Sequence, residues 1–370
     1  MNQNNKTSKK VRVSPVITRS IRIVVGIIVL AWMVWRFYNV IFVTAEYGAD
    51  TWVRFAFSGL IIGGMYALIA VGYTLVYGIL FMINFAHGEV MVIGAFGGYF
   101  VFELLNAITV TAVDGTEMAF LNAQPILALF LAFLAGMSIS AVSGFFLEKI
   151  AYRPLRTAPR LVPLISAIGA SIFLQNALQL LFGPQRRDYI NPAILARGTG
   201  WTIQIADKPV LLTYTGVFSL ALSIILMVAL ALVVQKTKMG KAMRSVAQDK
   251  PTSALMGIGV DNIISQTFVL SGVLAGAAGV MWGIHNGLIN YYTGFLPGIK
   301  AFTAAVLGGI GNIPGAMVGG MVLGIVESIG PAALAIDFQL KDVIAFSILV
   351  LVLIFRPQGI LGEALSEEKL

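Results

Sequence analysis

Charged residues are scarce in this chain. Lys, Arg, Asp and Glu together form 11% of its 370 residues, against roughly 25% in soluble domains, while hydrophobic residues form 58%. A globule of this size would need far more charge on its surface to stay soluble. The composition therefore excludes an ordinary soluble protein.

Cysteine is absent, and histidine occurs only at His87 and His285. The lack of cysteine excludes disulfide frameworks, thiolate metal sites and cysteine nucleophiles. The sequence also lacks the zinc-protease pattern H-E-x-x-H, the serine-hydrolase pattern G-x-S-x-G and the phosphate-binding pattern G-x-x-x-x-G-K-[ST]. We therefore expect a chain that is not an enzyme, holds no metal or cofactor and does not hydrolyse ATP itself.

Long apolar runs fill most of the sequence. A hydrocarbon core ~30 Å thick requires ~20 residues of helix, because the bilayer offers no water to unpaired backbone groups. We predict an all-α polytopic membrane protein with about 8–10 transmembrane or re-entrant helices, some of them broken at glycines. The predicted spans are residues 23–43, 55–81, 89–105, 125–147, 161–182, 210–234, 264–286 and 342–355.

A further apolar region, residues 299–330, is rich in glycine. Its 32 residues are too many for one upright span and too few for two full spans with a turn, so a re-entrant or broken-helix hairpin is predicted. Gly311, Asn312 and Pro314 mark its turn.

Basic residues gather in two stretches. The net charge is +8, of which residues 1–22 carry +6 and residues 235–250 carry +4, so that the rest of the chain sums to −2. Because Lys-rich and Arg-rich short loops stay in the cytoplasm, we predict that both stretches and both termini are cytoplasmic. Residues 183–209 are placed outside despite their four basic residues. Orientation and anionic headgroups then explain the charge, and no nucleic-acid partner is expected.

Residues 1–50 are predicted to form a basic cytoplasmic N-terminus and one extra transmembrane helix. A cleaved signal peptide is the alternative, because residues 23–35 form a 13-residue apolar run and Val43-Thr44-Ala45 resembles a signal-peptidase site. An uncleaved anchor is favoured because the apolar pattern continues through residues 37–43, and Trp32 and Trp35 suit a membrane interface.

Polar residues interrupt the apolar pattern around Gly88. A broken helix there would present the free N–H groups and positive dipole end of a new helix, which suits the carboxylate of a small zwitterion. We place Asn84, His87, Gly88 and Glu89 along a substrate pathway. The alternative is that Asn84 or His87 only caps the following helix and Glu89 occupies its first turn.

Lys300, Thr303 and Asn312 of the glycine-rich hairpin are assigned to the same pathway, with the turn at Asn312 facing residues 84–89. Breaks in both halves of the chain indicate a possible inverted repeat, an arrangement that often holds substrate sites at the membrane midplane. The alternative is that the glycines serve only tight helix packing.

Residues 235–262 form the longest cytoplasmic loop in this topology. Met239, Met243, Val246 and Ala247 recur at helical spacing, and Pro251 is expected to end that helix. A short amphipathic helix in such a loop is typical of a partner-docking element or of a helix lying on headgroups.

Several stretches together resemble the membrane subunits of branched-chain amino-acid ABC importers, most closely the LivH-like permeases. They read GYTLVYG at 72–78, INFAHGE at 83–89, KAFTAAVLGGIGNIPGAM at 300–317 and FRPQGILG at 355–362, and the resemblance extends over about residues 55–362. It implies a permease of the bacterial cytoplasmic (inner) membrane that moves branched-chain amino acids by alternating access. It also implies a second related permease, two cytoplasmic ATPase subunits that bind ATP and Mg²⁺, and an extracytoplasmic solute-binding protein.

The resemblance places the permease domain at residues 51–362, a cytoplasmic tail at 363–370 and the ATPase contacts in the basic loop. General importers carry E-A-A followed by a glycine; here Ala247-Gln248-Asp249 replaces the acid-led triplet, while Gly257 fits. The residues expected to couple to the ATPases are Gly240, Arg244, Asp249, Ala254 and Gly257.

Two other functions stay open. A urea or short-amide permease of the same superfamily would share these motifs. From another class, a self-sufficient ion-coupled secondary transporter or channel would need buried titratable groups, for which the candidates are Glu89, Glu103, Lys300 and Glu327.

Overall fold

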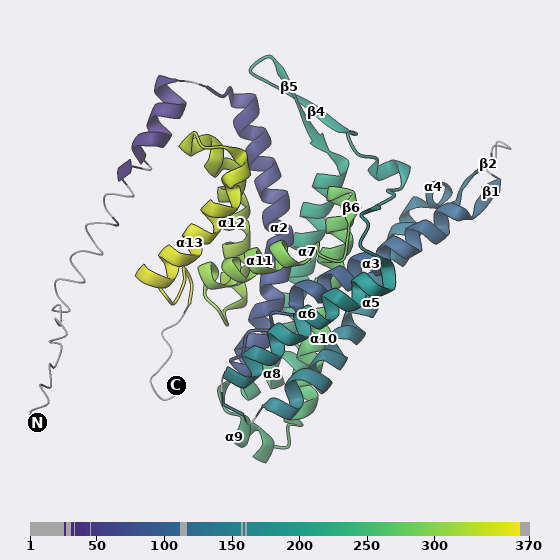
Figure 1. Cartoon of the computed structure of the whole chain (residues 1–370), viewed down its shortest axis with the longest axis vertical. Helices are drawn as coiled ribbons and strands as arrows, with labels where there is room; N and C mark the ends of the chain where they lie inside the picture. The colour runs from purple at the N-terminus through teal and green to yellow at the C-terminus, as the bar shows by residue number, and fades with distance from the viewer. Residues whose placement is uncertain are drawn as a thin grey trace, which may run out of the picture.

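The computed structural model describes residues 26, 31–32, 34–44, 46–111, 117–156, 158–159 and 161–362. These residues contain eight helices long and apolar enough to cross a membrane, which confirms the predicted all-α polytopic fold (Figure 1). The helices are α2 (Ala49–Leu80), α3 (His87–Ala107), α5 (Pro125–Leu147), α6 (Leu161–Phe182), α7 (Tyr214–Lys236), α10 (Val260–Asn286), α12 (Ile313–Leu334) and α13 (Lys341–Phe355), which together with the turn before it forms an 18-residue span, Phe338–Phe355.

Shorter elements connect these helices. A π-turn η2 (Glu148–Tyr152) and a 3₁₀ turn η3 (Arg153–Leu155) extend α5, and η5 (Phe338–Leu340) precedes α13. The remaining helical pieces are η1 (Asn39–Val43), α4 (Phe120–Ala123), η4 (Ala193–Leu195), α8 (Lys238–Gln248), α9 (Lys250–Leu255) and α11 (Phe295–Gly308). Three antiparallel strand pairs are β1 (Thr109–Thr111) with β2 (Glu117–Ala119), β3 (Arg187–Asp188) with β6 (Leu288–Ile289), and β4 (Gly200–Ile205) with β5 (Lys208–Thr213).

The two ends of the molecule differ in their elements. Helices α8 and α9 lie at one end, and the β4–β5 hairpin lies at the other (Figure 1). We call these the α8–α9 end and the β4–β5 end. The predicted topology agrees with this arrangement, because it puts residues 235–262 and 183–209 on opposite sides.

Most predicted spans match the helices closely. Helices α5 and α6 begin and end at the predicted residues, and α2 begins six residues before the predicted start at 55. The predicted start of the seventh helix at residue 210 is wrong, because residues 210–213 belong to β5. The turn residues Ala206 and Asp207 both have positive φ, 50° and 61°, as tight two-residue hairpins require. Thr213 then caps α7 by accepting a hydrogen bond from the Gly216 N–H.

The predicted first span, residues 23–43, lies partly outside the described residues. Within the described part, Arg36 Nε donates to the Leu334 carbonyl oxygen at 3.1 Å, and Val40 is buried. This segment therefore packs against the end of α12. Its possible cleavage and the orientation of residues 1–22 stay predictions.

Helices α2 and α12 touch through their backbones. A Cβ on Gly324 would lie 2.3 Å from backbone atoms of Gly63, and one on Gly320 would lie 2.4 Å from the Ala67 backbone. Such contacts have no room for a side chain, because real Cβ atoms do not approach within 3.0 Å of other heavy atoms. The glycines at this crossing therefore serve tight helix packing, which was one of the two roles considered for them from the sequence.

A second close crossing joins α3, α5 and α10. A Cβ on Gly94 would lie 2.4 Å from the Cα of Gly276, and one on Gly276 would lie 2.4 Å from the carbonyl oxygen of Gly136. The Ser140 hydroxyl donates to the Val90 carbonyl oxygen at 2.8 Å in the same region. Three helices from distant parts of the sequence are thus packed at backbone contact.

The glycine-rich region folds as the predicted hairpin, with unequal arms. Helix α11 has 14 residues, which span only about 21 Å, whereas α12 has 22 residues and can cross the bilayer. The turn uses Gly309 and Gly311, with φ of 112° and 93°. The C-terminal segment lies along it, because the N–H groups of Ile360 and Leu361 donate to the carbonyl oxygens of Leu307 and Gly308 at 2.8 and 2.9 Å.

The contact between α2 and α12 predicts a large cost for a single methyl group. Gly324→Ala should destabilise the protein by about 1–3 kcal/mol, because the two backbones must move apart. Gly169→Ala on α6 is the matched control, since a Cβ there meets nothing within 4 Å and alanine favours helix. Thermal unfolding of the purified protein in detergent would compare the two, and equal unfolding temperatures would contradict the packing argument.

Candidate functional site

The helix break predicted before His87 is present. Helix α2 ends at Leu80, Phe81 takes a left-handed conformation with φ of 56°, and α3 begins at His87. No side chain of the described residues caps α3, so the capping alternative for Asn84 and His87 is wrong, while Glu89 does lie in the first turn. Asn84 instead accepts a hydrogen bond from the Tyr152 hydroxyl at 2.9 Å, which joins the break to the end of α5.

His87 fills a slot between α2 and α10. Its side chain is 1% exposed, its Nδ1 lies 3.4 Å from the Ser271 hydroxyl, and its ring meets Tyr73 edge to face at 4.9 Å. Ser271 also donates to the Gly72 carbonyl oxygen at 3.0 Å. A Cβ on Gly72 would lie 2.2 Å from the His87 Nε2, so glycine is required to seat the imidazole. That Nε2 has no hydrogen-bond partner among the described residues.

Gly88 and Glu89 connect the same break to two further helices. A Cβ on Gly88 would lie 2.6 Å from the Gly294 carbonyl oxygen, where the chain enters α11. Glu89 is buried; its Oε1 accepts from the Ser171 hydroxyl of α6 at 3.5 Å, and its Oε2 has no partner in the described chain. The segment 84–89 thus brings unpaired polar groups to the meeting point of several helices, which is unusual in a membrane interior.

A buried charge cluster lies between α11, α12 and α13. Lys300 is 4% exposed, and its Nζ lies 2.7 Å from Glu327 Oε1 and 2.5 Å from Asp342 Oδ1. Lys341 Nζ lies 3.9 Å from Glu327, and the Lys300 ammonium lies 5.9 Å from the centre of the Tyr66 ring. The sequence indicated Lys300 and Glu327 separately and missed Asp342, because nothing local relates residues this far apart.

A cavity of about 380 Å³ adjoins this cluster. Residues of α2, α10, α11, α12 and α13 line it, together with the connection from α10 to α11 near the β4–β5 end. Small-molecule sites commonly occupy ~300–1,000 Å³ and combine an apolar wall with a few convergent polar groups. Lys300 lines the cavity, whereas Asn84, His87, Gly88 and Glu89 do not.

The other two pathway candidates make local hydrogen bonds. The Thr303 hydroxyl is buried and donates to the Ile299 carbonyl oxygen of its own helix at 3.0 Å. Asn312 caps α12 by accepting from the Gly315 N–H at 3.0 Å, and its amide donates to the Leu361 carbonyl oxygen at 2.8 Å. Their pathway roles and the inverted repeat stay predictions.

The basic loop contains the expected amphipathic helix. Met243 and Val246 of α8 are buried, while Met239 and Ala247 pack against the core from partly buried positions. The helix ends at Gln248, before Pro251, which lies in the first turn of α9. The expectation that Pro251 ends the helix is therefore wrong in detail.

Three of the expected coupling residues shape this loop from within. A Cβ on Gly240 would lie 2.1 Å from the Val234 carbonyl oxygen, and the Arg244 guanidinium donates to that same oxygen. Asp249 caps α9 by accepting from the Thr252 N–H at 3.1 Å. Hydrogen bonds from the Thr252 hydroxyl and N–H lower the pKa of the Asp249 carboxyl, so the cap is charged at neutral pH.

The remaining two coupling residues flank an exposed tip. Leu255 is 88% exposed and Met256 78% exposed, between Ala254 and Gly257, which are also exposed. Gly257 has a φ of 82°, a conformation that glycine adopts without strain. Exposed large apolar side chains side by side are typical of a contact surface.

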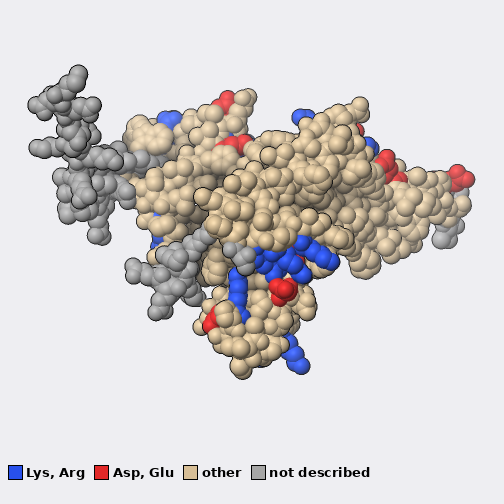
Figure 2. Space-filling model, turned by 60° about the horizontal axis from the view of Figure 1, so that its bottom comes forward, with Lys and Arg blue, Asp and Glu red and all other residues tan. Residues whose placement is uncertain are grey.

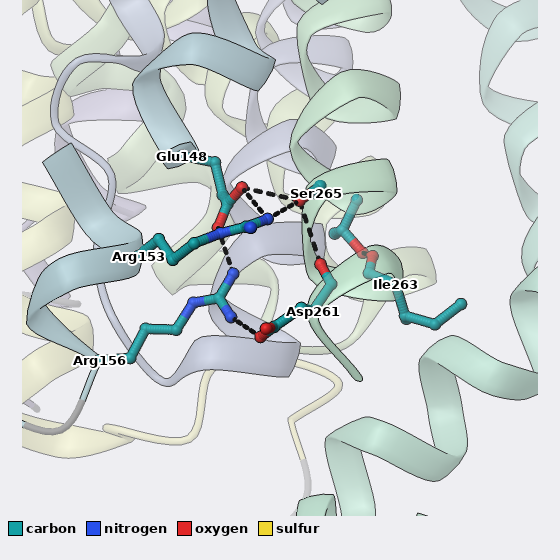
Figure 3. Close-up of polar contacts among 7 residues, drawn as sticks. Glu148, Arg153, Arg156, Asp261, Ile263 and Ser265 are labelled. Carbon is teal, nitrogen blue, oxygen red and sulfur yellow. Dashed lines mark hydrogen bonds and ion pairs between the residues drawn. The ribbon is translucent and has the colours of Figure 1, made fainter. Parts of the chain in front are cut away.

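A second cluster at the α8–α9 end escaped the sequence analysis. Glu148, Arg153, Arg156, Asp261 and Ser265 join the end of α5 to the start of α10, and we call them the arginine clasp (Figure 3). Glu148 is fully buried; it accepts from Arg153 through both carboxylate oxygens at 3.2 Å and from the Ser265 hydroxyl at 2.7 Å. Arg156 bridges Glu148 and Asp261. In the sequence, the cluster is visible only as one acidic residue, Glu148, next to a basic loop.

The clasp lies close to α9. Burial lowers the pKa of Lys250, and the positive charge of Arg156 lowers it further. Figure 2 shows this region from the α8–α9 end, where Lys and Arg side chains gather. The exposed lysines there are Lys149, Lys236, Lys238 and Lys241.

Glu148 should be the residue on which the clasp depends. Glu148→Gln keeps the side-chain volume but leaves two arginines without their shared carboxylate, which should cost about 3 kcal/mol. Asp261→Asn is the matched control, because the Asp261 side chain is 68% exposed and an exposed ion pair contributes about 1 kcal/mol or less. Thermal unfolding would measure both, and an equal loss in the two variants would contradict the ranking.

Comparisons with known proteins agree with this architecture. Residues 55–353 match the family model described as branched-chain amino acid transport system / permease component. The permease protein BraD of the high-affinity branched-chain amino acid transport system of Pseudomonas aeruginosa is 45% identical over 305 residues, covering 82% of this chain and 94% of that protein. The corresponding permease protein LivH of Escherichia coli K12 is 42% identical over 307 residues, covering 83% of this chain and 94% of that protein.

The chain is also similar, at lower identity, to a permease of a different transport system. The autoinducer 2 import system permease protein LsrC of Yersinia enterocolitica is 26% identical over 288 residues, which cover 74% of each chain. No solved structure matches the chain. The family match covers most of the sequence and includes the helix break, the glycine-rich hairpin and the amphipathic loop. The chain therefore belongs to the family of branched-chain amino acid transport system permease components.

Proposed function

We propose that this chain is a permease subunit of an ATP-driven importer for branched-chain amino acids in a bacterial inner membrane. The observation that carries this proposal is the 45% identity to a branched-chain amino acid permease over 82% of the chain. The eight apolar helices are consistent with a subunit that forms the membrane path. The α8–α9 end then faces the cytoplasm, as do both termini, since the lysine-rich loops gather there.

The tip at residues 254–257 is the proposed contact with ATPase subunits. Helix α8 is fixed to the core by buried Met243 and Val246, while Leu255 and Met256 project from the next helix into the open. A rigid support with an exposed apolar tip can transmit a push from a partner to the helices behind it. Two ATPases and a second related permease complete the proposed assembly, and a solute-binding protein would deliver the amino acid at the β4–β5 end. Alternating access of the path would follow ATP binding and release.

Reconstitution separates this proposal from its alternatives. The chain, its related permease and two ATPases in liposomes, supplied with the binding protein, should take up leucine only when ATP is present. A urea or short-amide permease would take up those solutes instead. Ion-driven uptake by this chain alone would indicate a secondary transporter and would overturn the proposal.

Leu255 and Met256 should couple transport to ATP hydrolysis. Replacing both with Asp should lower leucine uptake at least tenfold, because charged side chains cannot fill an apolar pocket on the partner. Lys238→Ala is the matched control at an exposed position of the same loop. The measurement is uptake per ATP hydrolysed in liposomes. Normal coupling in the double variant would remove the tip from the mechanism.

Asn84 and His87 should matter for transport rather than for assembly. Asn84→Ala and His87→Ala should each lower leucine uptake severalfold while the subunits still copurify, because both residues lie at the helix break that we place on the substrate pathway. Tyr152→Phe tests the hydrogen bond separately: it removes that bond but keeps the Asn84 side chain, so uptake should fall less than in Asn84→Ala. Unchanged uptake in both alanine variants would leave these residues a packing role alone.

A further inference from the structure

The cavity beside Lys300 has a charged wall. One buried cation, Lys300, faces two carboxylates, Glu327 and Asp342, at 2.7 and 2.5 Å. Lys341 comes within 3.9 Å of Glu327 from a half-exposed position. Lys300 and Glu327 are thus the deeply buried pair of this wall, whereas the side chains of Asp342 and Lys341 are 35% and 50% exposed and lie nearer to solvent.

One carboxylate oxygen of Glu327 accepts no hydrogen bond from the described residues. Glu327 is 4% exposed and lines the cavity, and its Oε1 bonds to Lys300 while its Oε2 accepts no hydrogen bond from the described chain. Leaving a buried charged oxygen unpaired costs at least as much free energy as a lost hydrogen bond.

The rest of the cavity has an apolar part and a cationic part. Ile62, Trp282 and Leu296 supply an apolar surface, and Arg186 and Lys341 supply cations. Arg186 is exposed and Lys341 half-exposed, so these two lie nearer to solvent than Glu327. A ligand that matches this division has a cationic group, an anionic group and a small aliphatic side chain.

We propose that this cavity binds an α-amino acid with an aliphatic side chain. The ammonium group donates to Glu327 Oε2, the side chain lies against Trp282 and Ile62, and the carboxylate points toward Lys341 and Arg186. This inference rests on the proposed function and specifies its substrate site, which the sequence had indicated only through Lys300. The site is at the β4–β5 end, where a binding protein would release its amino acid.

Absence of cysteine from the native chain allows a direct test. Leu296→Cys places a thiol on the cavity wall, where the residue is 42% exposed, and Gln204→Cys places one on exposed β4, outside the cavity. The assembled permease–ATPase complex in lipid nanodiscs, without binding protein, would be treated with a maleimide, and labelling of this chain followed by mass. Leucine should slow labelling at 296 at least fivefold and leave labelling at 204 unchanged.

Leucine analogues test whether Glu327 binds the ammonium group of the ligand. 3-Methylbutylamine, which keeps the ammonium and lacks the carboxylate, should protect position 296, whereas 4-methylpentanoate, which lacks the ammonium, should not. Glu327→Gln in the Leu296→Cys background should abolish protection by leucine and by the amine. Equal labelling rates with and without leucine in the parent variant, or full protection in Glu327→Gln, would overturn the proposal.

A second variant covers the case in which Glu327→Gln fails to assemble. Ile62→Phe fills the cavity without touching the charges, and it should abolish protection by leucine while the complex still assembles. Full protection in Ile62→Phe would also overturn the site. The proposed function is tested apart from it: ATP-driven leucine uptake by the parent complex with no protection at position 296 rejects this site alone, whereas absence of uptake rejects the function.

Discussion

Backbone contact between helices is the constraint on which the other features depend. In a membrane, lipid tails are as apolar as leucine, so helices gain little by hiding apolar side chains from them, and close van der Waals packing must hold the bundle together. Gly63 with Gly324, and Gly94 with Gly276, bring helix axes to distances at which any side chain would collide. Two tight units result, α2 with α12 and α3 with α5 and α10, and they meet where α2 passes α10.

Buried polar groups lie where glycines leave room between the packed helices. His87 is seated only because Gly72 has no side chain, and Gly88 lets α3 start against the chain entering α11. The short α11 cannot cross the bilayer, so the chain from Asn286 to Phe295 stays within reach of Lys300, Glu327 and the cavity. Irregular backbone at such a depth is tolerated where protein or a water-filled space covers it, and the described breaks follow that rule. The broken helices and the buried charges are thus two results of one packing arrangement.

Sequence reasoning predicted the features that depend on local composition. Apolar run length alone located α5 and α6 to the residue, polar interruption located the break before His87, and the turn residues Gly311, Asn312 and Pro314 located the turn of the hairpin. It failed where the structure of a segment depends on the segment that it pairs with. Residues 210–213 look like the apolar start of a helix until their pairing with β4 is seen, and the salt bridge between Lys300 and Asp342 joins residues 42 positions apart. The arginine clasp was not predicted for the same reason, since Arg156 and Asp261 are separated by 105 positions in the sequence.

At the α8–α9 end, the arginines and the lysines have different roles. Arg153, Arg156 and Arg244 bond to carboxylates or carbonyl oxygens of their own chain, and their planar guanidinium groups suit such fixed, multiple contacts. Lys149, Lys236, Lys238 and Lys241 are exposed and carry the charge that reaches outward. A strongly hydrated ammonium on a flexible stem suits headgroups and solvent better than a fixed pair. In the loop, Arg244 therefore fixes the backbone through its bond to the Val234 carbonyl oxygen, while the exposed lysines present their charge to headgroups and partners.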